Sequence, residues 1–155
     1  MRIVAYTPLM LKISERILLT LWVGGMWSVG YIVAPTLFKM LDRSVAGTVA
    51  GQLFTIMSYL GLVCAVLLLI NQFFRYGKAV TKHWQSWALG IMLLIVIIGE
   101  FFIAPEIRSM RDAGLVDSEK ARFGMLHGSA SVLFLISSLL GLALVIFGLH
   151  KKENT

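Results

Sequence analysis

The sequence predicts an all-α integral membrane protein, a bundle of four membrane-spanning helices. Of its 155 residues 58% are hydrophobic and only 14% are charged, whereas soluble proteins average about 25% charged residues. The apolar residues form four blocks, and each has about the 20 residues that a helix needs to cross a bilayer core. Backbone polar groups cannot stay unpaired in lipid, so each block is expected to be helical. We therefore expect one four-helix domain spanning residues 1–155.

The predicted spans cover about residues 17–34, 53–74, 87–103 and 123–149. Glu15 and Arg16 are expected to mark the water boundary before the first span. Pro35 is predicted to end the first helix and Pro105 to turn the chain after the third, because proline lacks an N–H donor and restricts the residue before it.

Positive charges predict the orientation. Of the 14 Lys and Arg residues, a majority of about eight to six lies on the side of the termini and the 75–86 loop. The positive-inside rule therefore places both termini in the cytoplasm. The net charge of +6 flanks membrane spans, so the bilayer is the predicted partner and nucleic acid is not.

A short internal repeat links the two halves. Residues 34–42 read Ala-Pro-Thr-Leu-Phe-Lys-Met-Leu-Asp, and residues 104–112 read Ala-Pro-Glu-Ile-Arg-Ser-Met-Arg-Asp. Alanine, proline, methionine and aspartate recur at one offset. This pattern predicts two parallel helical-hairpin repeats related by an axis along the membrane normal.

Polar residues in the outer halves of the spans define a candidate site. An ionisable residue inside a membrane is costly and is by default a functional-site hypothesis. Glu100 and His127 are such residues. Two roles suit their side chains: exchange of a proton with each other, or an ion pair with Arg108 or Arg111. Convergent polar groups in an apolar setting suit a small-ligand pocket, and they equally suit a hydrogen-bond network that only fixes helix packing. The candidate pocket residues are Tyr31, Gln52, Tyr59, Glu100, His127 and Ser131.

Motifs for other chemistries are missing from the sequence. It contains no phosphate loop, dinucleotide fingerprint, nucleophile elbow or zinc-binding helix, so neither an enzyme activity nor a cofactor is predicted. The outer-half methionines Met40, Met57, Met110 and Met125, with His127, have the ligand types that Cu(I) prefers. Methionine also fills irregular apolar gaps, and no metal site is predicted.

Several motifs resemble the transmembrane protein 205-like family. They are Leu21-Trp-Val-Gly-Gly-Met-Trp27, Ala34-Pro-Thr-Leu-Phe38, Ala46-Gly-x3-Gly-Gln-Leu-Phe54, Ala104-Pro-Glu106 and Phe123-x3-His-Gly-x-x-Ser131. The resemblance implies four helices, the bacterial inner membrane and no known enzyme activity. The residues that match the family pattern are Trp22, Gly25, Pro35, Phe38, Phe54, Pro105, His127 and Ser131.

The function expected from these observations is that of a small membrane protein with an outward-facing polar pocket for a small solute or ion. Four helices rarely enclose a transport pathway alone, so we expect a homo-oligomer or a membrane partner. The alternatives are a structural or accessory subunit of a membrane complex and, less favoured, a metal or redox protein.

Overall fold

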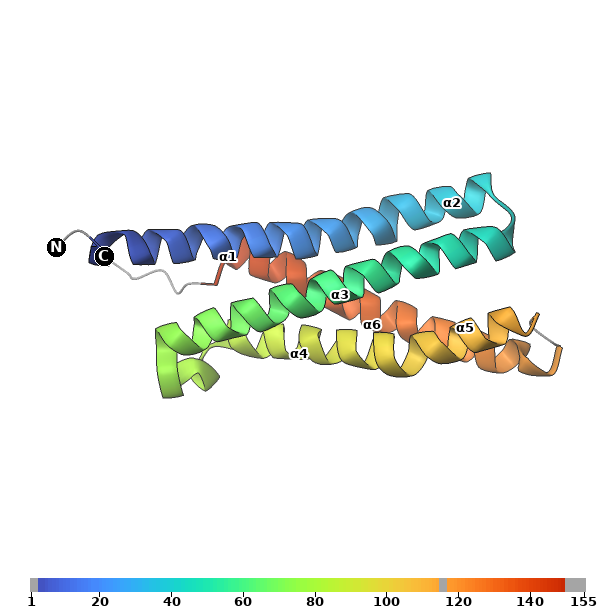
Figure 1. Ribbon diagram of the computed structural model, residues 1–155. Coiled ribbons are helices and arrows are strands. Elements are labelled where there is room, and N and C mark those ends of the chain that lie inside the picture. Colours follow the sequence, from blue (N-terminus) through green and yellow to red (C-terminus); the bar gives the residue numbers. More distant parts are fainter. Residues whose placement is uncertain (1–2, 115–116, 150–155) are drawn as a thin grey trace.

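The computed structural model describes residues 3–114 and 117–149, and within these ranges every regular element is helical. Figure 1 shows the elements as long rods lying side by side. In chain order they are α1 (Ile3–Trp27), η1 (Ser28–Val33), α2 (Ala34–Met40), α3 (Arg43–Tyr76), η2 (Gly77–Lys82), α4 (Trp84–Ile98), η3 (Gly99–Ile103), α5 (Ala104–Asp112), η4 (Asp117–Glu119) and α6 (Lys120–Phe147).

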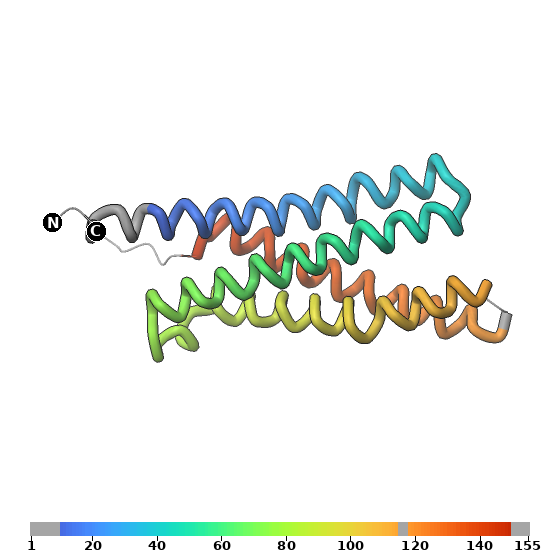
Figure 2. Tube along the Cα trace, in the orientation of Figure 1, coloured from blue at the N-terminus to red at the C-terminus, as the bar shows by residue number. Residues whose placement is uncertain are grey.

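Four continuous helical stretches are long and apolar enough to cross a membrane: Met10–Met40, Arg43–Lys82, Trp84–Asp112 and Lys120–Phe147. The helices α1 and α4 each pack against both α3 and α6, which closes a four-membered ring. The predicted all-α, four-helix membrane bundle is therefore confirmed. Figure 1 shows the start of α1 at the same end of the bundle as η2. The end of α6 also lies at that end, and η4 lies at the opposite end (Figure 2).

The hydrophobic core fills the half of the bundle nearest η2. Trp22, Leu68, Leu89 and Leu144, one from each long helix, are at most 2% exposed and belong to one cluster. Small residues allow this packing. At Gly61, a Cβ atom would lie 2.5 Å from Nε1 of Trp22, so the indole lies directly against the α3 backbone.

Pro35 and Pro105 do not end their helices, which corrects the expectation from the sequence. Each stands in the first turn of a short α-helix that continues the preceding helix. A π-helical segment precedes each: the Ala34 N–H bonds the carbonyl of Val29, and the Ala104 N–H bonds the carbonyl of Gly99. Because proline cannot donate to the preceding turn and its ring crowds that turn, a widened turn lets the helix continue.

Glu15, which is expected from the sequence at the water boundary, is packed inside the bundle against α3. It is 2% exposed, and its Oε1 lies 3.2 Å from Nη2 of Arg75 near the end of α3. Burying a carboxylate is costly unless an opposite charge accompanies it, so this ion pair allows α1 to be packed against α3 before the apolar core begins. Nearby, Gln72 is also buried and donates from Nε2 to the carbonyl of Leu149.

At the end of the bundle opposite η2, the helices separate into two pairs. The short helix α2 packs against α3, and α5 packs against α6. Ala46 and Ala50, both under 5% exposed, form the small-residue surface of α3 at this end. The space between the α2–α3 pair and the α5–α6 pair holds the candidate site.

Candidate functional site

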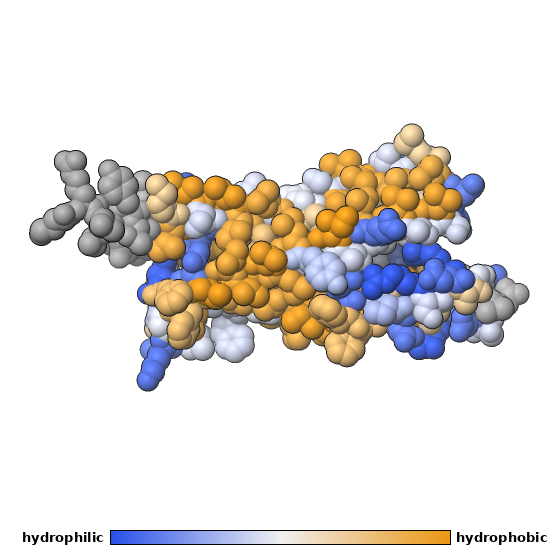
Figure 3. Space-filling view, viewed as in Figure 1, coloured by the Kyte–Doolittle hydropathy of each residue, from blue (hydrophilic) through white to orange (hydrophobic). Residues whose placement is uncertain are grey.

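A cavity of about 550 Å³ opens between the two helix pairs, with walls from all four membrane-spanning stretches. This volume lies within the range of ligand pockets, roughly 300–1,000 Å³. Figure 3 shows apolar residues over most of the visible side of the bundle, with hydrophilic residues at its two ends and many of them at the end where α5 lies. Most side chains that line the cavity are apolar, including Phe38, Phe54, Phe134, Ile107 and Val96.

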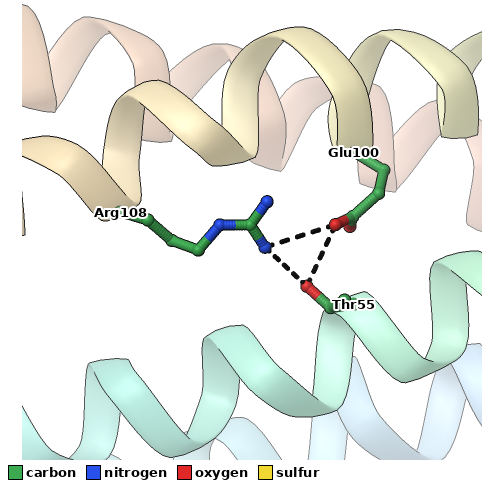
Figure 4. A network of polar contacts seen from close by, with 3 residues as sticks. All are labelled: Thr55, Glu100 and Arg108. Atoms are coloured by element: carbon green, nitrogen blue, oxygen red, sulfur yellow. Dashed lines mark hydrogen bonds and ion pairs between the residues drawn. The ribbon is translucent and has the colours of Figure 1, made fainter.

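Glu100, Arg108 and Thr55 form a polar network on the cavity wall (Figure 4). Nη1 of Arg108 lies 3.2 Å from Oε1 of Glu100 and donates to Oγ1 of Thr55 over 2.9 Å. The Thr55 hydroxyl in turn donates to Oε1 of Glu100 over 3.2 Å. The Glu100 side chain is 5% exposed and the Arg108 side chain 43% exposed, so the carboxylate is buried inside the bundle and its cationic partner is partly exposed.

Arg111, one turn beyond Arg108, lies across the glycines of α3. A Cβ atom at Gly51 would stand 3.2 Å from its Nη1, and one at Gly47 would stand 3.4 Å from its Nη2. Glycines four residues apart lie on one helix face, so they leave a shallow groove for the guanidinium. Arg111 lines the cavity.

The structure places four of the six predicted pocket residues on the cavity wall: Tyr31, Glu100, His127 and Ser131. Gln52 and Tyr59 do not line it. Gln52 is exposed on the outer surface of the bundle, and Tyr59 is 53% exposed with its ring against Phe101. Both residues lie at the level of the cavity along α3, but their side chains project from the opposite face of that helix.

His127 is not a partner of Glu100, whose carboxylate bonds Thr55 and Arg108 instead. The imidazole stacks on Phe123, with ring centroids 6.0 Å apart and planes inclined by 4°. The Ser131 hydroxyl donates to the His127 carbonyl one helical turn before it. Direct proton exchange between Glu100 and His127 is therefore absent from this conformation, and Glu100 makes the ion pair with Arg108.

The residues that carried the family resemblance mostly pack the helices around this cavity. Trp22, Pro35, Phe38 and Phe54 line it, whereas Pro105 is exposed. The ring of Phe54 meets Phe134 edge-on at 5.5 Å. At Gly25, a Cβ atom would lie 2.5 Å from the terminal carbon of Met57.

Thr55, Arg108 and Arg111 are absent from the predicted pocket set, although Arg108 and Arg111 are expected from the sequence as ion-pair partners of Glu100 or His127. Thr55 has one signal in the sequence. It is a hydroxyl residue in the outer half of the second span, where its side chain can bond a buried carboxylate. Arg111 has a weaker signal in the Gly47-x3-Gly51 pair, because small residues at that spacing allow close approach. The packing of α5 relative to α3 decides which side chain occupies this groove.

The described residues contain no group of three or more His, Cys, Asp and Glu side chains arranged to hold a metal ion. Among the outer-half methionines, Met40 and Met125 are 76% and 66% exposed and Met110 is 4% exposed. Met57 lines the cavity, as His127 does.

Comparison with known proteins gives the family. Residues 17–115 match a family described as "Domain of unknown function (DUF4149)". The chain belongs to this family. An uncharacterised protein of Aquifex aeolicus (strain VF5) is 32% identical over 123 residues, which cover 79% of this chain and 84% of that protein. No solved structure matches.

The DUF4149 match includes the polar network and Arg111 but ends before α6, which contributes His127 and Ser131. The family assignment supports a membrane protein of unknown function. The narrower transmembrane protein 205-like name remains a prediction from the motifs.

Proposed function

We propose that this DUF4149 protein binds a small solute in the cavity between the α2–α3 and α5–α6 pairs. The observation that carries the proposal is the Glu100–Arg108–Thr55 network on the wall of a roughly 550 Å³ cavity. Ionisable groups inside a membrane protein are expensive, and they commonly face a bundle interior or a water-filled cavity that serves function. A network needed only for helix packing does not require an adjoining cavity of ligand size.

Binding is proposed and not catalysis. The Glu100 carboxylate is engaged by a guanidinium and a hydroxyl, which leaves it a poor candidate for proton abstraction. The nearby hydroxyls of Thr55 and Ser131 make hydrogen bonds to Glu100 and to a backbone carbonyl, respectively. These bonds suit a site that positions a ligand.

We further propose that the protein resides in a bacterial inner membrane, with both termini in the cytoplasm and the cavity open to the outside. The excess of Lys and Arg on the side of η2 supports this orientation. The described core closes the η2 half of the bundle around Leu68, Leu89 and Leu144, so a passage through the membrane requires self-association or a partner subunit. We therefore propose an oligomer or a complex for any transport role.

Cysteine accessibility tests the proposal. The native Cys64 is 1% exposed and is replaced by alanine to give a thiol-free background. Ser58→Cys then places a thiol on the cavity wall, and Ile56→Cys provides the matched control, because Ile56 lies two residues away on α3 and is 63% exposed on the outer face. Both are labelled in spheroplasts with a membrane-impermeant, water-soluble thiol reagent.

The proposal predicts rapid labelling at position 58 and little at position 56, because the cavity holds water and the outer face contacts lipid. Equal protection of both thiols means a dry bundle, which supports the alternative of a structural or accessory subunit. Labelling at position 58 only in inverted vesicles reverses the orientation and leaves the cavity intact.

A further inference from the structure

We propose, resting on the binding function above, that the ligand is an amphiphilic anion: a carboxylate or phosphate group held by Arg111, attached to an apolar chain that lies along the cavity wall. Three features favour this class of ligand: the net charge of the cavity lining, the surroundings of Arg111 and the shape of the cavity.

The cavity carries a surplus of positive charge. Its charged lining residues are Glu100, Arg108 and Arg111, with His127 as a further titratable group. Glu100 and Arg108 compensate each other over 3.2 Å. Arg111 then contributes one uncompensated positive charge, since its side chain makes no hydrogen bond or ion pair with the described residues. Arg111 is half-buried, so leaving its charge unpaired carries part of the cost of a buried charge, and an anionic ligand supplies the missing partner.

Arg111 is also held in a geometry suited to an anion. Its guanidinium rests against Gly47 and Gly51, which limits the side-chain freedom that binding would otherwise have to remove. Guanidinium presents paired N–H donors that match carboxylate and phosphate oxygens bidentately. Arg108 adds to this, because its bonds to Glu100 and Thr55 both use Nη1 and leave its other donors for a ligand.

The remaining lining explains the apolar part of the ligand. The cavity follows α3 from Gly47 to Ser58, which at 1.5 Å per residue is about 16 Å. Arg111 lies over the Gly47 end, and the opposite end is lined by Trp22, Met57 and Val96. A long pocket that is cationic at one end and apolar at the other fits a chain with an anionic head, and it leaves most of its volume unused by a small inorganic anion.

Tryptophan quenching tests this ligand class in the full-length protein. The protein is reconstituted in phosphatidylcholine nanodiscs, and Trp27, Trp84 and Trp87 are replaced by phenylalanine. Trp22 then reports on the cavity, because it lines the cavity and is only 2% exposed. The probes are a terminally brominated fatty acid, its uncharged methyl ester and a tail-brominated phosphatidylglycerol. The fatty acid and the lipid distinguish a free carboxylate from a phosphate headgroup as the source of the anion.

The expected result is saturable quenching by the fatty acid or by the anionic lipid, with the ester at least tenfold weaker. Arg111→Gln should weaken binding of the anion about tenfold or more, the scale of a lost hydrogen bond to a charged group, and Arg111→Lys should weaken it less. Arg122→Gln is the matched control, since Arg122 pairs with Glu106 on the exposed surface outside the cavity.

Equal quenching by acid and ester overturns the anionic ligand and leaves the proposed binding function standing, and this comparison needs no variant at Arg111. If no probe quenches Trp22 while the Ser58→Cys thiol still reacts, the amphiphile is wrong and the cavity takes another solute. If no probe quenches and that thiol is protected, both proposals fail.

Discussion

The Arg108 guanidinium meets the Glu100 carboxylate at 3.2 Å from a position eight residues further along the same continuous helical stretch, on the far side of Pro105. In an α-helix of 3.6 residues per turn, residues seven apart share a face, and residues eight apart diverge by about 80°. The π-helical segment Gly99–Ile103 places an additional residue in one turn. The eight-residue spacing then behaves like a spacing of seven, which turns both side chains towards the cavity.

The first membrane-spanning stretch has the same backbone feature without the charges. Its π-helical segment also precedes an Ala-Pro pair, and Gly30 stands four residues before Ala34, where Glu100 stands four before Ala104. The ring of Phe134 fills the place of a side chain at Gly30. This correspondence is compatible with the proposed hairpin duplication, which remains a prediction.

Replacing Glu100 by glutamine should lower stability. Removing one partner of a fully buried ion pair costs about 3–5 kcal/mol, and the 43% exposure of Arg108 reduces the expected loss to about 1–2 kcal/mol. Unfolding is followed with a fluorogenic thiol reagent, because the single Cys64 is 1% exposed in the folded protein.

The control for Glu100→Gln is Glu106→Gln. Glu106 pairs with Arg122 at 2.7 Å, but both side chains are about half exposed, so its loss should cost less than about 0.5 kcal/mol. Equal stability losses in the two variants are incompatible with a buried structural pair at Glu100.

Replacing Pro105 by alanine should uncouple Glu100 from Arg108. Alanine restores the N–H that proline lacks and removes the ring that crowds the preceding turn, so the segment should return to a regular α-helix and rotate Arg108 away. A double-mutant cycle with Glu100→Gln and Arg108→Gln measures the coupling, expected at about 1 kcal/mol with Pro105 and near zero without it.

The matched background for that cycle is Pro35→Ala. Pro35 follows the other π-helical segment, which carries neither member of the pair. Coupling should therefore persist there, and an equal loss of coupling in both backgrounds would falsify the role assigned to the Gly99–Ile103 segment.

Gly30→Ala should destabilise the bundle, whereas Gly24→Ala should not. A Cβ atom at Gly30 meets the Phe134 ring, and nothing lies within 4 Å of one at Gly24. Overpacking typically costs about 1–3 kcal/mol, and replacing an unhindered helical glycine by alanine gains about 0.5–1 kcal/mol. The Cys64 unfolding assay compares the two variants, and a Gly30→Ala protein as stable as Gly24→Ala would show that the ring moves aside freely.

Labelling of the two connecting segments tests the proposed orientation. In a Cys64→Ala background, Ser118→Cys marks the η4 end and Thr81→Cys the η2 end, and both native residues are exposed. With both termini cytoplasmic, an impermeant reagent added to spheroplasts should modify the first thiol and spare the second. The reverse pattern would show that the cavity opens to the cytoplasm.

Four apolar helices could be predicted from the sequence, because the length and hydrophobicity of a segment are local properties that decide whether it can cross a bilayer. The sequence also singled out Glu100, since a carboxylate in an apolar span is costly wherever the helix packs. It could not determine the course of the chain at Pro35 and Pro105: proline removes a hydrogen bond in either case, and only tertiary packing decides whether the helix ends or widens.

Which polar residues share the cavity depends on how the helices pack. Gln52, Thr55 and Tyr59 lie within two turns of one helix, yet Thr55 alone faces Glu100. The selection depends on how α3 is rotated against α4 and on the added residue in the π-helical turn before Pro105. Both are set by side-chain packing between helices distant in sequence, which no local pattern encodes.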